Sequence, residues 1–126
     1  MSTVTELIDR YFAMWNEADG RRRRDLIGEV WTESASYVDP MLEAEGHAGI
    51  DAMVAGVHAR FPGHRFRRTG DVDVHHDRVR FQWELGPDGG PAIVKGVDFG
   101  VLAGGKRLAA ITGFFDQAPA APSQPQ

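Results

Sequence analysis

The chain has 126 residues, of which 42% are hydrophobic and 25% charged, a formal net charge of -4 and no cysteine. This length and composition predict one globular domain, and they exclude disulfide scaffolds, thiol nucleophiles and cysteine-based zinc sites. The acidic balance argues against nucleic acid as a partner, because phosphate binding needs a basic surface. No apolar run approaches the roughly 18 residues of a membrane span, and the amino terminus lacks a signal pattern, so we expect no membrane association and a cytoplasmic location.

Helical periodicity dominates the first half of the chain. Apolar residues recur at helical spacing over residues 4–15, and Thr3 with Glu6 fits a capping box at the start of this helix. A shorter helix is expected with an apolar side over residues 26–31, and the run of four arginines at 21–24 is interpreted as a solvent-exposed face.

A brief strand is then expected over residues 34–40, followed by an acidic loop at 43–49 and a third helix over 50–61. The second half changes to strand periodicity, with strands expected at 65–75, 78–85, 92–102 and 107–116. Residues 1–117 are therefore predicted to form one α+β domain, with three amino-terminal helices packed in the concave face of a curved, mostly antiparallel sheet. The tail at 118–126, rich in Pro, Ala and Gln, is predicted to be disordered.

Asp39 stands out as a candidate for chemistry because it ends an apolar strand and precedes a proline that restricts its backbone. Apolar neighbours at Met41 and Leu42 favour a carboxyl group that accepts a proton near neutral pH. The alternative is an Asx turn that closes the strand. Asp98 lies within a predicted strand, so its carboxyl is expected to be paired, protonated or turned toward a wet cavity. The alternative is a pairing on the outer face with Lys95 or with an arginine of a neighbouring strand.

Two further polar residues fall on apolar helix faces. Tyr11 either finds a structural partner or projects its hydroxyl into a cavity, and His58 is expected to be a core or pocket histidine rather than a metal ligand. No metal or cofactor site is predicted. The alternation over residues 78–85 does not decide whether Arg80, Gln82 and Glu84 or their apolar neighbours line a pocket.

The order of these elements resembles the nuclear transport factor 2-like superfamily, and in particular its SnoaL-like branch of cone-shaped proteins. The resemblance covers about residues 4–116 and is carried by the stretches at residues 10–19, 37–40, 46–50 and 96–99 and by 104–108 together with 113–116. Within this superfamily, ketosteroid isomerase has the most similar residue pattern. That resemblance implies Asp39 as general base, with Tyr11 and a protonated Asp98 as hydrogen-bond donors to the dienolate oxygen. In ketosteroid isomerase, apolar surroundings keep the donor carboxylic acid neutral.

The resemblance leaves function open, because this fold also serves binding and assembly modules. The leading hypothesis is an isomerase or lyase that abstracts a proton next to a carbonyl of a bulky apolar small molecule. The alternatives are a ligand-binding or accessory module without turnover and a purely structural dimerisation module. Polyketide cyclases of this fold carry their acid/base carboxylate on the last strand, where this chain has Thr112 and Gly113. This difference argues against cyclisation by the family mechanism.

A homodimer through the outer face of the sheet is also expected. The residues predicted to line the pocket are Trp15, Met53, Val57, His58, Phe61 and Phe114.

Overall fold

The computed structural model describes residues 3–104 and 106–118. Over these ranges the chain forms three helices and one sheet of seven strands, which confirms the predicted α+β class. The predicted disordered tail lies outside the described residues except for Ala118. None of the described helices is long and apolar enough to cross a membrane.

Helix α1 spans Val4–Asn16 and begins at the predicted capping box. The main-chain N–H of Glu6 donates to Oγ1 of Thr3 over 3.0 Å, and the N–H of Thr3 donates to Oε1 of Glu6 over 2.7 Å. These two bonds satisfy donors that the first turn of a helix would otherwise leave unpaired. The buried stripe of α1, which includes Leu7, Tyr11 and Trp15, faces the sheet.

Helix α2 spans Gly20–Val30 and starts earlier than the apolar pattern indicates. The carboxylate of Asp19 accepts from the N–H groups of Arg21 and Arg22, which places a negative charge at the helix start to offset the arginine run. The expectation that this run is wholly solvent-exposed is wrong for Arg23, which is buried. Its guanidinium donates to Oδ1 of Asp51 over 2.7 Å and thereby ties α2 to the next helix.

The strands begin directly after α2. Strand β1 covers Trp31–Val38, β2 covers Glu43–Glu45 within the segment expected to be a loop, and α3 covers Gly46–Arg60. The remaining strands are β3 (His64–Arg68), β4 (Asp73–His75), β5 (Arg78–Pro87), β6 (Val94–Ala103) and β7 (Arg107–Gln117). β2 pairs antiparallel with β1 across the short turn between them, and this pairing, rather than apolar alternation, makes its three residues a strand.

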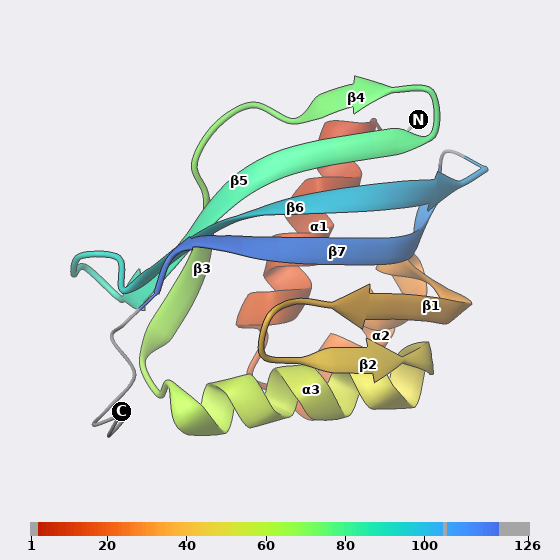
Figure 1. The fold of residues 1–126 in the computed structure, drawn as a ribbon. Coiled ribbons are helices and arrows are strands. Elements are labelled where there is room, and N and C mark those ends of the chain that lie inside the picture. The colour runs from red at the N-terminus through yellow and green to blue at the C-terminus, as the bar shows by residue number, and fades with distance from the viewer. Residues whose placement is uncertain (1–2, 105, 119–126) are drawn as a thin grey trace, which may run out of the picture.

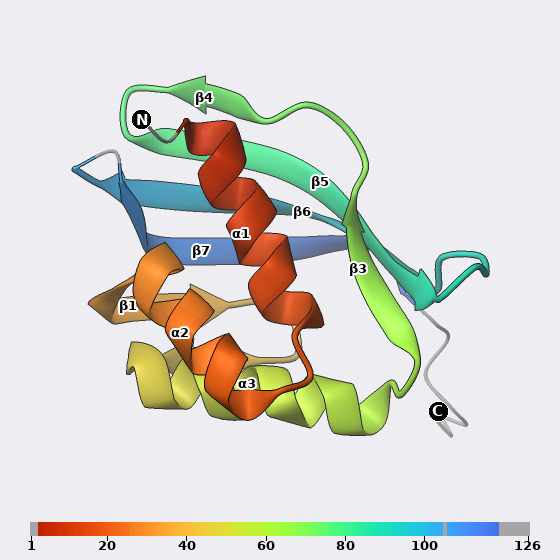
Figure 2. The same ribbon diagram turned by 180° about the vertical axis from the view of Figure 1, so that it is seen from behind.

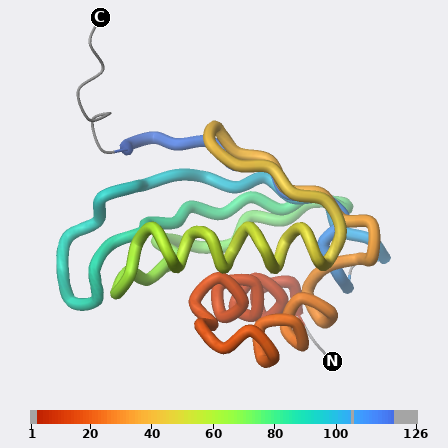
Figure 3. Tube along the Cα trace, turned by 90° about the horizontal axis from the view of Figure 1, so that it is seen from below, coloured from red at the N-terminus to blue at the C-terminus, as the bar shows by residue number. Residues whose placement is uncertain are grey.

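The sheet order is β2-β1-β7-β6-β5-β3, with β4 also paired to β5. All neighbours are antiparallel except β1 and β7, which run parallel, so the sheet is mostly antiparallel as predicted. Figure 1 shows β5, β6 and β7 side by side, with α3 along the lower edge. Figure 2 shows α1 and α2 across the other face of these strands, and Figure 3 shows the sheet arching over the helices.

The structure decides the orientation of β5, which the sequence left open. Val79, Phe81, Trp83 and Leu85 are buried on the helix side, and the alternating polar residues of the strand face outward. On β6 the same alternation turns Asp98 inward and Phe99 outward. Because successive residues of a strand point to opposite faces, this register fixes which side chains reach the interior.

Candidate functional site

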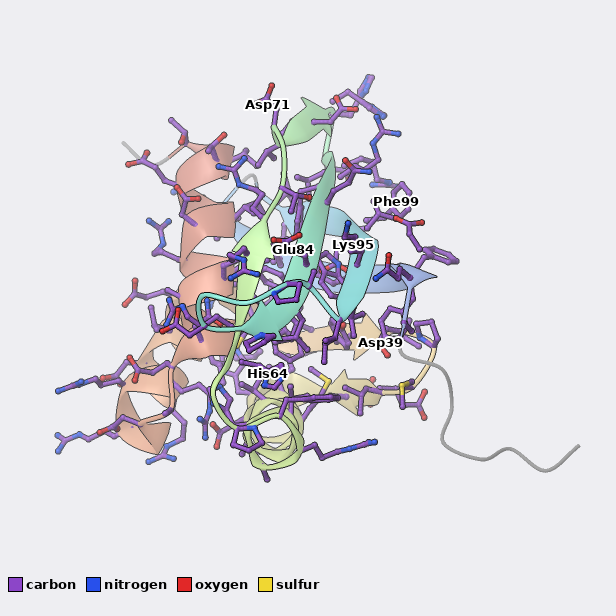
Figure 4. The ribbon with its side chains drawn as sticks, turned by 90° about the vertical axis from the view of Figure 1, so that its left-hand side faces the viewer. Asp39, His64, Asp71, Glu84, Lys95 and Phe99 are labelled. Carbon is purple, nitrogen blue, oxygen red and sulfur yellow. The ribbon has the colours of Figure 1, made fainter. Side chains whose placement is uncertain are left out.

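A cavity of about 710 Å³ lies at one end of the molecule. It is bounded by α3, by the turn after β1 and by the inward faces of strands β3, β5, β6 and β7. Figure 4 looks onto this end, with α3 seen end-on and Asp39 and His64 labelled. The volume falls within the range of about 300–1,000 Å³ that is usual for small-molecule sites.

Aromatic side chains form a continuous row along the cavity. The ring centroids of Tyr37 and Trp15 are 5.5 Å apart, those of Trp15 and Phe66 are 4.9 Å apart, and those of Phe66 and Trp83 are 5.7 Å apart. Phe115 extends the row, with its ring centroid 5.9 Å from that of Trp83. All five residues line the cavity, so a flat apolar molecule would meet aromatic surface along its length.

Asp39 lines this cavity and also closes the turn between β1 and β2. Its Oδ1 accepts from the main-chain N–H groups of Met41 and Leu42, each over 2.8 Å. Its Oδ2 accepts from the hydroxyl of Tyr37 over 2.6 Å. The Asx-turn interpretation and the cavity interpretation therefore describe the same residue, because one carboxyl oxygen holds the turn and the other lies with Tyr37.

Tyr37 is a residue of the cavity that the sequence reasoning missed. It precedes Asp39 by two positions, and residues two apart on a strand share a face, which was the available signal. The hydroxyl is deeply buried, and this burial, together with the negative charges of Asp98 and Asp39, raises its pKa well above the ordinary value of tyrosine. Tyr37 is therefore a hydrogen-bond donor across the neutral pH range.

Asp98 forms a second polar cluster beneath the cavity wall. Its side chain is buried, with only 3% of the residue exposed, and burial raises its pKa to about 7. Oδ2 accepts from the hydroxyl of Tyr11 over 2.7 Å, and Oδ1 accepts from Nε1 of Trp83 over 2.9 Å. The alternative pairing with Lys95 is not formed, because Lys95 is on the outer face of β6.

The structure therefore separates the three residues predicted to be catalytic. Asp39 lines the cavity, whereas Tyr11 and Asp98 bond to each other and do not line it. Gly113 lets the two acidic groups approach: a Cβ atom at this position would lie 2.8 Å from Oδ1 of Asp98 and 3.2 Å from Cβ of Asp39. The two polar clusters are thus neighbours, joined across a glycine of β7.

Four of the residues predicted to line the pocket do so: Trp15, Met53, Val57 and Phe61. Two lie elsewhere. Nε2 of His58 donates to the main-chain carbonyl of Trp15 over 2.7 Å and so ties α3 to α1. Phe114 is on the outer face of β7, where 53% of it is exposed, and its neighbour Phe115 lines the cavity instead. Two adjacent phenylalanines on a strand point to opposite faces, and the sequence did not tell which one is inside.

The comparisons with known proteins agree with this architecture. The family model described as SnoaL-like domain matches residues 8–122. A SnoaL-like family protein from Agrobacterium tumefaciens, provisionally named an isomerase, has 38% sequence identity over 89% of this chain and 96% of its own chain, with a TM-score of 0.84. No functionally curated protein matches the chain.

More distant structures share the fold. A protein from Jannaschia sp. CCS1, provisionally named a SnoaL-like polyketide cyclase, is 22% identical over 89% of this chain and 86% of its own, with a TM-score of 0.65. A Catenulispora acidiphila protein with a ketosteroid isomerase-like fold, solved with trimethylamine, is 16% identical over 89% of this chain and 85% of its own, with a TM-score of 0.71. The chain belongs to the SnoaL-like domain family.

Proposed function

We propose that the protein binds a bulky, mostly apolar small molecule that carries a carbonyl group, and that Asp39 removes a proton from the carbon next to that carbonyl. The observation that carries this proposal is the position of Asp39, which is the one carboxylate of the described residues that lines the aromatic cavity. A carboxylate beside apolar walls can accept a proton from a bound substrate, and the walls keep water away from the reacting carbon. Return of the proton from Asp39 to another carbon of the substrate completes an isomerisation, and departure of a leaving group with the electron pair of the enolate completes a lyase reaction.

Tyr37 takes the donor role in this proposal. The family pattern implied Tyr11 and Asp98 as donors to the substrate oxygen, but the hydroxyl of Tyr11 is directed at Asp98 and neither residue lines the cavity. Tyr37 does line it, and its hydroxyl is beside the proposed base. When a substrate oxygen gains negative charge, the Tyr37 hydroxyl can turn from Asp39 to donate to it. Asp98 and Tyr11 then position the strands behind the site.

The test is an isomerisation assay. The protein is incubated with a β,γ-unsaturated ketosteroid, and the absorbance of the conjugated enone is followed. We expect wild-type turnover and its loss in Asp39→Asn, a variant with the same shape and no basic carboxylate. Turnover that persists unchanged in Asp39→Asn would exclude Asp39 as the base.

A ligand carrier without turnover is the second candidate function. The observation that favours it is that Asp39 already accepts three hydrogen bonds, as a structural turn residue does. Trp15 and Trp83 line the cavity, so quenching of tryptophan fluorescence reports binding in either case. Saturable quenching by the steroid, with no enone formed, would assign the protein to this second class.

We also propose that two copies of the chain pair through the outer face of the sheet. Val38, Phe99 and Phe114 are exposed on this face to 43%, 43% and 53%, and the rings of the two phenylalanines touch, with centroids 5.9 Å apart. Apolar side chains gathered on one sheet face favour a self-complementary contact between identical copies.

A further inference from the structure

Arg60 brings a positive charge to the cavity. It is in the last turn of α3, its side chain lines the cavity, and the residue is exposed at the same time. Its guanidinium carbon is 5.9 Å from the centroid of the Phe61 ring, which also lines the cavity. Arg60 therefore lies at the boundary between the aromatic cavity and the solvent.

This arginine has no acidic partner in the described part of the chain, residues 3–104 and 106–118. Seven other arginines do form ion pairs with carboxylates: Arg23, Arg24, Arg67, Arg68, Arg78, Arg80 and Arg107. The acidic group of the cavity does not pair with Arg60 either, because Asp39 is held by the Tyr37 hydroxyl and two main-chain N–H groups. The guanidinium is thus available to a ligand.

Asp39 and Arg60, the two charged residues of the described chain that line the cavity, lie in different parts of its wall. Asp39 is in the turn between β1 and β2, whereas Arg60 is at the carboxyl end of α3, and this end of the helix extends beyond the turn (Figure 1). Ala52, Met53, Gly56 and Val57 continue the lining face of α3 inward from Arg60. A ligand whose apolar body lies along this face and the aromatic row would place its outer end at Arg60.

We propose that the molecule bound in this cavity is an apolar carboxylate and that Arg60 binds its anionic group. This inference rests on the binding function proposed above. The guanidinium offers two parallel N–H donors that match the two oxygens of a carboxylate. The backbone at the carboxyl end of a helix carries partial negative charge, so an anion gains nothing from the helix itself. The attraction must come from the side chain of Arg60, and replacing that side chain should remove it.

A matched pair of probes tests this assignment. 1-Pyrenebutyrate and 1-pyrenebutanol share a flat apolar body and differ in the charge of the end group. Binding of either is followed by energy transfer from Trp15 and Trp83 to pyrene, since both tryptophans line the cavity. We expect wild-type protein to bind the carboxylate about tenfold more tightly than the alcohol, as for a charge-assisted bond at a partly exposed site. The preference should shrink as salt is added, because exposed charges are screened.

Three variants make the test specific to Arg60. Arg60→Gln should weaken the binding of 1-pyrenebutyrate and so bring the two dissociation constants together. Arg60→Lys should keep part of the preference for the carboxylate. Arg65→Gln is the matched control, because Arg65 is an exposed arginine of β3 that does not line the cavity, and it should keep the full preference.

The outcomes separate the inference from the function on which it rests. Equal binding of the two probes by wild-type protein would overturn the carboxylate assignment and leave the binding function standing. If Arg60→Gln weakens the binding of both probes equally and lowers the melting temperature, Arg60 has a structural role at the helix end, and the inference is overturned. Failure of wild-type protein to bind either probe would contradict the binding function and the inference with it.

Discussion

The hydroxyl of Tyr37 donates a hydrogen bond to Oδ2 of Asp39 over 2.6 Å, and both residues line the same cavity. Tyr11 makes the corresponding bond to Asp98 over 2.7 Å behind the cavity wall. The chain thus contains two tyrosine–aspartate pairs, one that lines the cavity and one behind its wall. The two pairs should therefore respond differently to removal of the tyrosine hydroxyl.

Tyr37→Phe should reduce enone formation by about 100-fold, which is the lower range for the loss of one donor to a developing oxyanion. The free energy of unfolding should fall by only about 1 kcal/mol, because the ring stays in place and one hydrogen bond is lost. Tyr11→Phe is the matched comparison, and it should cost more stability, since it leaves the buried Asp98 carboxyl with Trp83 as its remaining donor. Urea unfolding and the absorbance assay measure the two effects. A larger loss of turnover in Tyr11→Phe than in Tyr37→Phe, at matched stability, would reverse the assignment.

Asp98 should make stability depend on pH. Burial raises its pKa from 3.8 to about 7, so the folded protein holds this proton over a pH range in which the unfolded chain has released it. The stabilisation is fully present below pH 4 and is lost as pH rises from about 4 through about 7. The pKa difference corresponds to a loss on the order of 4 kcal/mol. Urea unfolding at a series of pH values between 4 and 8 measures the dependence.

The matched variant for this prediction is Asp98→Asn, which cannot ionise. Its free energy of unfolding should fall less between pH 4 and pH 7 than that of the wild type. At pH 4 the two proteins should be similarly stable, because the protonated carboxyl and the amide have the same shape, the amide oxygen can accept from Trp83 and the amide N–H₂ group can donate to the hydroxyl of Tyr11. Other titrating groups affect both proteins, so the difference between the two profiles isolates Asp98. Parallel profiles would show that Asp98 does not titrate in this range.

Gly113 should tolerate no side chain. A Cβ atom there would lie 2.8 Å from Oδ1 of Asp98, so Gly113→Ala must push the two polar clusters apart. We expect a loss of about 1–3 kcal/mol in unfolding free energy, as for an overpacked interior, together with lower turnover. Gly28→Ala is the control, because nothing lies within 4 Å of its added Cβ and the position is inside α2. That change should stabilise the protein by about 0.5–1 kcal/mol. Equal effects of the two substitutions would contradict this account.

The proposed dimer should depend on the outer phenylalanines. Phe114→Asp places a charge beside Phe99 on the exposed sheet face, and it should convert a dimer into a monomer without unfolding the domain. Light scattering after size-exclusion chromatography measures the mass of each. Val74→Asp is the control, since Val74 is similarly exposed at 41% but lies on β4, and it should leave the mass unchanged. Wild-type protein that elutes as a monomer at micromolar concentration would count against the dimer.

Local sequence signals predicted most of the elements. The capping box at Thr3, the strict alternation of β5 and the glycine-rich turn after it depend on neighbours within a few residues, so they can be read without a structure. β2 was missed because three residues form a strand there only through pairing with β1. α2 began earlier than its apolar stripe because the Asp19 cap, rather than the stripe, sets its start.

The site was predicted in part. Asp39 was singled out from its position at a strand end before a proline, and it lies on the cavity. Tyr37 was not singled out, because its position on the cavity depends on the elements that pack around β1 and not on its neighbours in sequence. The inward choice of Phe115 over Phe114 depends on the register of β7 against β6, which the two adjacent phenylalanines do not reveal.

The sequence by itself determined that helices and strands form one α+β domain and that carboxylates and tyrosines are the available reactive groups, because periodicity, capping and the absence of cysteine are properties of the chain alone. Only the tertiary structure decided which carboxylate meets the cavity. Asp39 follows β1 and Asp98 lies in β6, and β7 separates these strands, with Gly113 paired opposite Asp98. The packing of Trp83 and Tyr11 around Asp98 buries that carboxyl, whereas the turn after β1 leaves Asp39 at the cavity wall.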